Sequence, residues 1–182
     1  MFNNNGEVHH QFPVKRNDYH NRPAMIVDSK RKVVIMDNRF FKKGCVLDVY
    51  GNDGQFVRSF GQGLLRSALD LALASDDRVI VLDTDSYVHM FSEHGDHLSK
   101  FKLTFSLHTR RIAFYHSSEH VVLADVGVGY VYLHIYTKDG ELVRKTKICV
   151  EGIDETQRRM IVTAEGHVAL LSFQCDRVFI VC

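Results

Sequence analysis

The sequence contains no tryptophan and only two prolines among its 182 residues. It therefore has no proline-rich linker, and nothing in its composition indicates a disordered tail or a low-complexity array. No apolar run approaches the roughly 20 residues that a membrane-spanning helix needs. The opening residues also lack the basic-then-apolar pattern of a secretory signal. We expect a single cytoplasmic domain that does not bind a membrane.

Disulfide and metal frameworks are also missing from the cysteine pattern. The four cysteines are scattered and form no C-x-x-C pair. Such spacing is typical of free thiols in a reducing compartment and argues against a zinc site. The formal charge is +1, from 23 Lys and Arg against 22 Asp and Glu. This balance excludes a uniformly basic or acidic protein, so any charge argument must rest on local clustering.

A repeat of two features runs along the chain. Turns centred on glycine recur, and an aromatic residue stands four positions before each glycine. The four pairs are Phe2 with Gly6, Tyr50 with Gly54, Phe91 with Gly95, and Tyr136 with Gly140. Apolar runs that end at Asp37, Asp83, Asp125 and Ser172 lie between them, about 42 to 47 residues apart. This is the spacing of a four-stranded β-propeller blade.

The repeat predicts an all-β fold of about four blades with about 16 strands. Each unit reads as short β-branched or aromatic runs between polar turns, and no helical apolar stripe persists. We expect residues 1–12 to supply one outer strand, residues 24–60, 69–101 and 111–146 to form full repeats, and residues 159–182 an incomplete last one. The opening strand could complete the last blade and close a four-bladed ring.

The apolar strands, D-G turns and aromatic positions in 69–101 and 111–143 resemble the NHL repeat. The stretch from VYLHIYTKDGELV to the end of the chain is similar to the last blades of TRIM-NHL proteins of the Brat type. That resemblance implies a ring of six blades, whereas this chain has material for four. We therefore expect either part of a six-bladed ring, prone to self-association or to completion by further blades, or a closed four-bladed ring.

Two motifs that suggest catalysis have structural explanations. His116, Glu119 and His120 match the zinc-peptidase pattern H-x-x-E-H, but that motif requires a helix, and here it bridges two predicted strands. We interpret it as a hairpin turn. The aspartates at positions 37, 83 and 125 recur at one repeat position, which indicates caps of turns rather than a carboxylate site. We predict neither an enzyme nor a cofactor or metal; a metal-dependent lyase, as in some NHL-like propellers, is a weaker alternative.

Basic residues cluster in the loops predicted on one face of the propeller. We predict that this face contacts a partner through Arg39, Phe40, Phe41, Lys42, Lys43, Arg66, Arg110, Arg111, Arg158 and Arg159. Clustered cations attract a polyanion, and aromatic and guanidinium planes can stack unpaired bases. The alternative explanation is that the aromatics fill space between blades and the arginines are ordinary solvated charges.

The resemblance favours the functional interpretation, because several TRIM-NHL propellers bind RNA through this face. The leading hypothesis is a non-enzymatic propeller that binds single-stranded or looped RNA in post-transcriptional regulation. The rival is a protein-interaction platform that binds acidic protein segments or acts as a substrate adaptor for a ubiquitin ligase.

Overall fold

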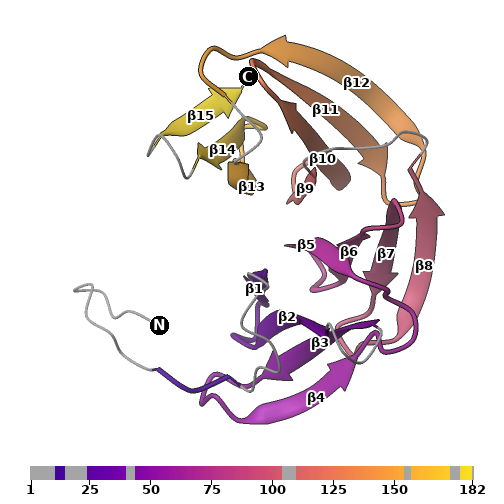
Figure 1. Cartoon of the computed structure of the whole chain (residues 1–182). Helices are drawn as coiled ribbons and strands as arrows, with labels where there is room; N and C mark the ends of the chain where they lie inside the picture. The colour runs from indigo at the N-terminus through magenta and orange to yellow at the C-terminus, as the bar shows by residue number, and fades with distance from the viewer. Residues whose placement is uncertain are drawn as a thin grey trace. The chain divides into compact units, whose positions relative to one another are not determined.

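Short antiparallel strands make up the described part of the chain (Figure 1). The computed structural model describes residues 11–14, 24–39, 44–103, 110–153, 157–172 and 177–181, and these hold fifteen strands and no helix. The strands fall into four sheets in which each strand pairs with its neighbour in sequence. This meander is the architecture of propeller blades. The predicted all-β propeller with four blades is confirmed.

The strand bounds follow the four repeats. The first sheet contains β1 (Met25–Val27), β2 (Val33–Arg39), β3 (Gly44–Tyr50) and β4 (Phe56–Phe60). The second contains β5 (Ala68–Leu73), β6 (Val79–Asp83), β7 (Tyr87–Phe91) and β8 (His97–Lys102). The third contains β9 (Arg110–Tyr115), β10 (His120–Gly127), β11 (Tyr130–Thr137) and β12 (Leu142–Cys149). The fourth has three described strands, β13 (Gln157–Val162), β14 (Val168–Ser172) and β15 (Val178–Val181).

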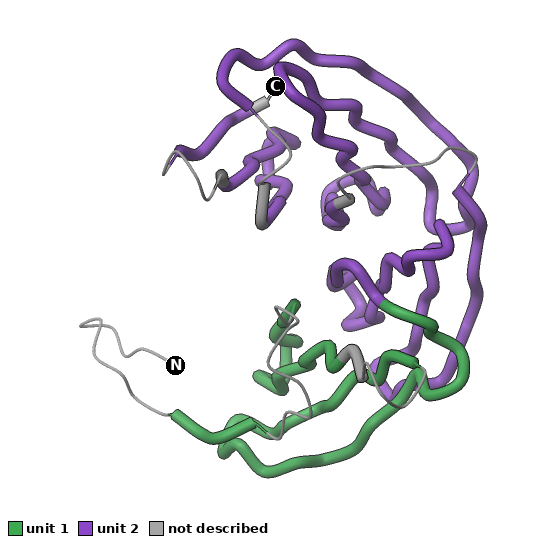
Figure 2. Tube along the Cα trace, in the orientation of Figure 1, with its two compact units in different colours: residues 1–67 green, residues 68–182 purple. Residues whose placement is uncertain are grey.

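The chain divides into two compact units (Figure 2). Unit 1, residues 1–67, contains the first sheet, and unit 2, residues 68–182, contains the other three. In unit 2 the first strands of the three sheets, β5, β9 and β13, lie against one another in that order. The fourth strands β8 and β12 carry mostly exposed side chains. Burial therefore decreases from the first and second strands of a blade toward its fourth.

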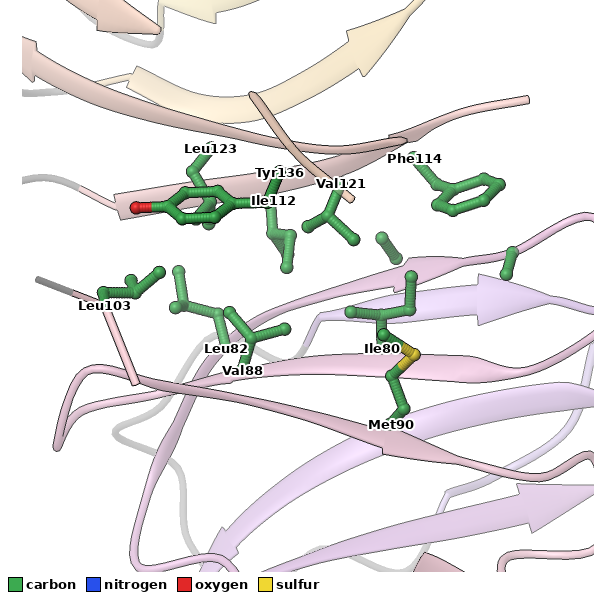
Figure 3. Packing of buried hydrophobic residues seen from close by; sticks show 12 residues of the cluster. Ile80, Leu82, Val88, Met90, Leu103, Ile112, Phe114, Val121, Leu123 and Tyr136 are labelled. Carbon is green, nitrogen blue, oxygen red and sulfur yellow. The ribbon is translucent and has the colours of Figure 1, made fainter. Parts of the chain in front are cut away.

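Apolar side chains from both faces of the third sheet are buried between blades. In unit 2, Ile80, Leu82, Val88 and Met90 of the second sheet face a row on the third sheet (Figure 3). That row is made of Ile112, Phe114, Val121, Leu123 and Tyr136. The opposite face of the third sheet packs on the fourth sheet through residues such as Val122 and Leu170. Burial on both faces explains why the inner strands read as continuous apolar runs rather than as alternating ones.

Phe101 and Phe12 each stand six residues after a glycine of the repeat, Gly95 and Gly6, and each packs on a neighbouring sheet. Phe101, at the end of β8, lies 5.5 Å from the ring of Tyr136 and covers Gly140 in the β11–β12 turn. Phe12 lies 5.7 Å from Tyr50 and covers Gly54 in the β3–β4 turn. Both glycines have positive φ, so the turn needs glycine for its backbone as well as for the space.

Residues 1–10 of the predicted opening outer strand lie outside the described residues. Residues 11–14 carry no strand, but Phe12 and Val14 pack against Val33, Ile35 and Tyr50 of the first sheet. They occupy the places that Phe101 and Leu103 take on the third sheet. Completion of the last blade by this strand stays a prediction.

The three repeated aspartates occupy one register position. Asp37 pairs with Val46 and Asp125 with Tyr132, and Asp83 follows the pair of Leu82 with Val88. The carboxylate of Asp83 accepts hydrogen bonds from the backbone N–H of Asp85 at 2.9 Å and the hydroxyl of Thr84 at 3.2 Å. The predicted turn cap is therefore present at Asp83. Strands β2 and β10 each continue for two residues past their aspartate, whereas β6 ends there.

Candidate ligand-binding surface

The predicted basic residues differ in how much of them the structure describes. Phe40, Phe41, Lys42 and Lys43 lie outside the described residues. Arg39, Arg110 and Arg158 are described only through their backbone, at the end of β2 and near the starts of β9 and β13. The side chains of Arg66, Arg111 and Arg159 are described, and Arg66 and Arg159 are exposed.

Two of these arginines lie beside a buried carboxylate. Asp70 in β5 accepts hydrogen bonds from the backbone N–H of Leu71 at 3.0 Å and of Ile112 at 3.1 Å. Arg159 Nη1 in β13 lies 3.7 Å from Asp70 Oδ1. Burial raises the pKa of Asp70, while those two N–H groups and the charges of Arg111 and Arg159 oppose the rise. The carboxylate thus connects the first strands of three consecutive blades.

This arrangement changes the interpretation of Arg111 and Arg159. Because both interact with Asp70, part of their charge compensates a buried anion of the same molecule. They are therefore weaker candidates for phosphate contacts than solvated side chains would be. The sequence pattern does not reveal this, because Asp70 stands inside an apolar strand more than 40 residues away from either arginine.

The structure places lysines and tyrosines together on two neighbouring blades. On the second sheet, Lys100 Nζ and Lys102 Nζ lie 4.9 Å and 5.7 Å from the centre of the Tyr87 ring. His89, buried beside this ring, shares a 3.2 Å hydrogen bond between its Nδ1 and His97 Nε2. We call these residues, with Asp83, the first Lys–Tyr cluster.

The third sheet repeats this arrangement 45 residues later. Lys145 Nζ lies 5.1 Å from the centre of the Tyr132 ring, and Lys147 Nζ lies 5.5 Å from it. Lys147 Nζ is also 4.7 Å from the Tyr130 ring. These residues, with buried His134 and with Asp125, form the second Lys–Tyr cluster. Tyr87, His89, Lys100 and Lys102 thus correspond one to one with Tyr132, His134, Lys145 and Lys147.

A β-bulge brings each lysine pair to the same face as its tyrosine. The register shifts between Met90 and Phe91, so that Lys100 pairs with His89 and Lys102 with Tyr87. Without this shift in register the lysines would lie opposite the neighbouring positions and point to the other face. The same shift occurs between Ile135 and Tyr136 in the third sheet. Reasoning from loops missed the four lysines because they lie within strands.

One predicted residue shares a row with the second cluster. Arg110 pairs with Asp125, Asp125 with Tyr132, and Tyr132 with Lys147. Residues directly opposite each other in a sheet lie on one face. Arg110 therefore holds a position on the same face and at the same end of the blade as Lys147.

The histidines of both clusters are poor proton acceptors. Burial lowers the pKa of His134 to about 4, with Lys145 lowering it further and Asp125 raising it. Burial also lowers the pKa of His89, where His97 and Lys100 lower it further and Asp83 raises it. Both rings are therefore neutral at pH 7, and the lysines supply the positive charge. Exposed ammonium groups beside aromatic rings suit an anionic ligand that also has planar groups.

The H-x-x-E-H segment forms the predicted turn. His116 to Glu119 connect β9 to β10, and Glu119 has a φ of 55°. His116 Nδ1 bonds Ser75 Oγ at 3.1 Å and His120 Nδ1 bonds Ser118 Oγ at 2.7 Å. Within the described ranges, no three His, Cys, Asp or Glu side chains gather as metal ligands would.

Two buried histidines follow the repeat. His89 and His134 occupy one repeated position, on the third strands of the second and third sheets. The strands that lie against one another at the inner side of unit 2, β5, β9 and β13, contain no histidine.

No helix among the described residues is long and apolar enough to cross a membrane.

Comparison with known proteins identifies the fold and not a family. No family model matches the chain, and no curated protein matches its sequence. Among solved structures, virginiamycin B lyase from Staphylococcus aureus matches with a TM-score of 0.58 at 12% identity, over 87% of this chain and 54% of that one. The WD40 β-propeller domain of Doa1 matches with a TM-score of 0.59 at 17% identity, over 87% and 49%.

BamB from Moraxella catarrhalis is a third match, with a TM-score of 0.54 at 16% identity. That match covers 81% of this chain and 39% of BamB. The chain thus spans about half the length of the propellers that it matches, or less. The NHL resemblance is not confirmed by these comparisons. What they and the sheet topology show together is that this chain is a β-propeller.

Proposed function

We propose that this propeller is a non-catalytic RNA-binding module, and that the two Lys–Tyr clusters form the centre of its binding surface. The observation that carries the proposal is the repetition of tyrosine and two lysines at equivalent positions of neighbouring blades. A single-stranded nucleic acid combines phosphates with planar bases, so it matches a surface on which cations lie close to aromatic rings. An acidic protein segment would need the cations alone.

The predicted loop residues fit this proposal unequally. Arg110 extends the row of the second cluster, and Arg39, Lys42, Lys43 and Arg158 remain candidates for phosphate contacts. Phe40 and Phe41 remain candidates for stacking. Arg111 and Arg159 contribute less, because Asp70 shares their charge.

A pair of charge reversals tests the proposal. Lys102→Glu combined with Lys147→Glu should weaken binding of a fluorescein-labelled single-stranded RNA at least about tenfold, since two phosphate contacts become repulsive. Fluorescence anisotropy at physiological salt measures the affinity. The control combines Lys30→Glu with Lys138→Glu, in the β1–β2 and β11–β12 turns, and changes the net charge equally.

Equal weakening by both pairs would show generic attraction and contradict the proposed surface. If the unaltered chain binds no RNA at physiological salt, the protein-interaction hypothesis leads instead. In that case acidic protein segments should bind, and the same lysine reversals should weaken that binding. A β-propeller is in general capable of protein interaction, so that rival needs no other fold.

A further inference from the structure

Unit 2 ends in a sheet that exposes an apolar face. Ile161, Leu171, Val178 and Ile180 are exposed by 61%, 44%, 61% and 66%. Their register places them together, because Ile161 pairs with Ala169, Ala169 with Ile180, and Leu171 with Val178. The other face of this sheet packs on the third sheet through Met160, Val168 and Leu170. A contiguous apolar face of this kind marks an interaction site.

The repeat identifies what this face is built to contact. Its members correspond in register to residues of the second sheet that are buried against the third: Ile161 to Ala72, Leu171 to Leu82, Val178 to Val88, and Ile180 to Met90. In the second sheet these residues are at most 5% exposed. The exposed face is therefore the half of an interblade contact that receives the following blade.

Unit 1 carries the other half of such a contact. Met25 and Val27 in β1 are 55% and 49% exposed. Met25 pairs with Ile35 and Val27 with Val33, which makes them the counterparts of Ile112 and Phe114 in the third sheet. Those two residues are only 2% and 5% exposed, because the second sheet covers them.

The two exposed faces keep the apolar character of a contact between blades. In the contact between the second and third sheets, Ala72 and Ala74 share a cluster with the large ring of Phe114. At the exposed faces the small residue is replaced by Ile161 and the large one by Val27. Ala169 stands in the place of Ile80, so the larger Ile161 is offset within the β13–β15 face, and cores tolerate volume-conserving substitutions of this kind best.

We infer that the β13–β15 face of one copy of this chain binds the β1–β3 face of a second copy, as consecutive blades bind within unit 2. The contact is head to tail, so two different surfaces meet. The matched propellers are about twice as long as the part this chain covers, and a second copy supplies further blades of the same repeat. The inference does not depend on RNA binding.

Mixing two variants tests the inference. Sedimentation velocity should show association of the unaltered chain at micromolar concentration, because the contact hides apolar side chains from water. Ile180→Glu destroys one face and Val27→Glu the other, and each variant alone should be monomeric, with association weakened at least about tenfold. An equimolar mixture should form a heterodimer, because the intact faces belong to different copies. Val143→Glu, an exposed outer-strand control in β12, should associate normally.

Three results would overturn the inference. The first is an unaltered chain that is monomeric at all concentrations, which is the result expected of a closed four-bladed ring. The second is a mixture that stays monomeric although each variant shows the circular dichroism spectrum of the unaltered chain. The third is an equal decrease of association in the Val143→Glu control. Leu171→Glu offers a second variant of the same face if Ile180→Glu does not fold.

Discussion

Three buried polar side chains have pKa values that are shifted by their surroundings. His89 and His134 have their pKa lowered by burial, and Asp70 has its pKa raised. Each shift favours the neutral form, as burial in a medium of low dielectric should. The neighbouring charges differ: lysines stand beside the histidines, whereas arginines stand beside the aspartate. Ionised Asp70 is thereby compensated, while a protonated His134 would be repelled by Lys145.

His134 should make the protein less stable in mildly acidic solution. Its folded-state pKa of about 4 lies below the ordinary value of 6.5, so the unfolded chain binds a proton more readily. Stability should therefore fall as the pH decreases from about 6.5 toward 4, by about 2 kcal/mol near pH 5 for this group. Urea unfolding at pH 7 and pH 5 measures the difference. His134→Gln should remove most of this contribution, and an unchanged difference would contradict the assignment.

A glycine turn and a β-bulge beside it repeat together between the third and fourth strands of a blade. A glycine turn allows the aromatic of the preceding blade to approach, as Phe101 covers Gly140. A bulge beside each of these turns then sets the register of the outer strand. The turn thus determines both how neighbouring blades pack and which side chains reach the Lys–Tyr clusters.

Two glycines of the third sheet allow the cost of backbone strain to be compared with the cost of a steric clash. Both Gly129 and Gly140 have positive φ, of 78° and 90°. A Cβ at Gly129 would meet nothing within 4 Å, whereas one at Gly140 would lie 2.5 Å from Phe101 Cβ. Gly129→Ala should cost about 1 kcal/mol of folding free energy from strain alone, and Gly140→Ala about 2 kcal/mol more. Urea unfolding compares the two, and equal costs would show that the contact with Phe101 contributes nothing.

At the scale of the whole molecule, a net charge of +1 conceals local clusters. Lysines gather on the outer strands of the second and third sheets, and basic residues recur in the loops between strands. The proposed RNA binding would then depend on the position of these charges and not on the total charge. The salt dependence of binding measures how many phosphates such clusters contact.

Charge reversals in three places should show this dependence on position. Arg110→Glu with Arg111→Glu, or Lys42→Glu with Lys43→Glu, should weaken RNA binding by about 1 kcal/mol or more for each phosphate interaction removed. In the arginine pair most of this loss should come from Arg110, because Asp70 shares the charge of Arg111. Lys30→Glu with Arg31→Glu changes the net charge equally, in a turn at the other end of its blade, and should have little effect. Titrations at several salt concentrations should show a smaller salt slope only for the first two pairs. An equal slope for all three would contradict a localised surface.

Stacking is tested separately from charge. Phe41→Ala should weaken binding of single-stranded RNA and leave binding of duplex RNA nearly unchanged, because paired bases offer no free face. Anisotropy with both probes measures this. Equal weakening with both would assign Phe41 to packing between blades.

The sequence alone predicted the class of fold and the four blades. The predicted repeat 69–101, for example, corresponds to the four strands of the second sheet, which run from Ala68 to Lys102. These features are local, since apolar runs, turn glycines and their spacing are all written within one repeat. The H-x-x-E-H turn was predicted correctly for the same reason.

Only the tertiary structure decided which side chains meet. Asp70 reaches Ile112 and Arg159 because the first strands of three blades lie against one another, a contact that no local pattern encodes. Lys102 joins Tyr87 because one extra residue in a bulge changes the register, and a shift of one position moves a side chain to the opposite face. Turn glycines and apolar runs therefore determine the blades, whereas strand register and contacts between blades determine the surface that a ligand would bind.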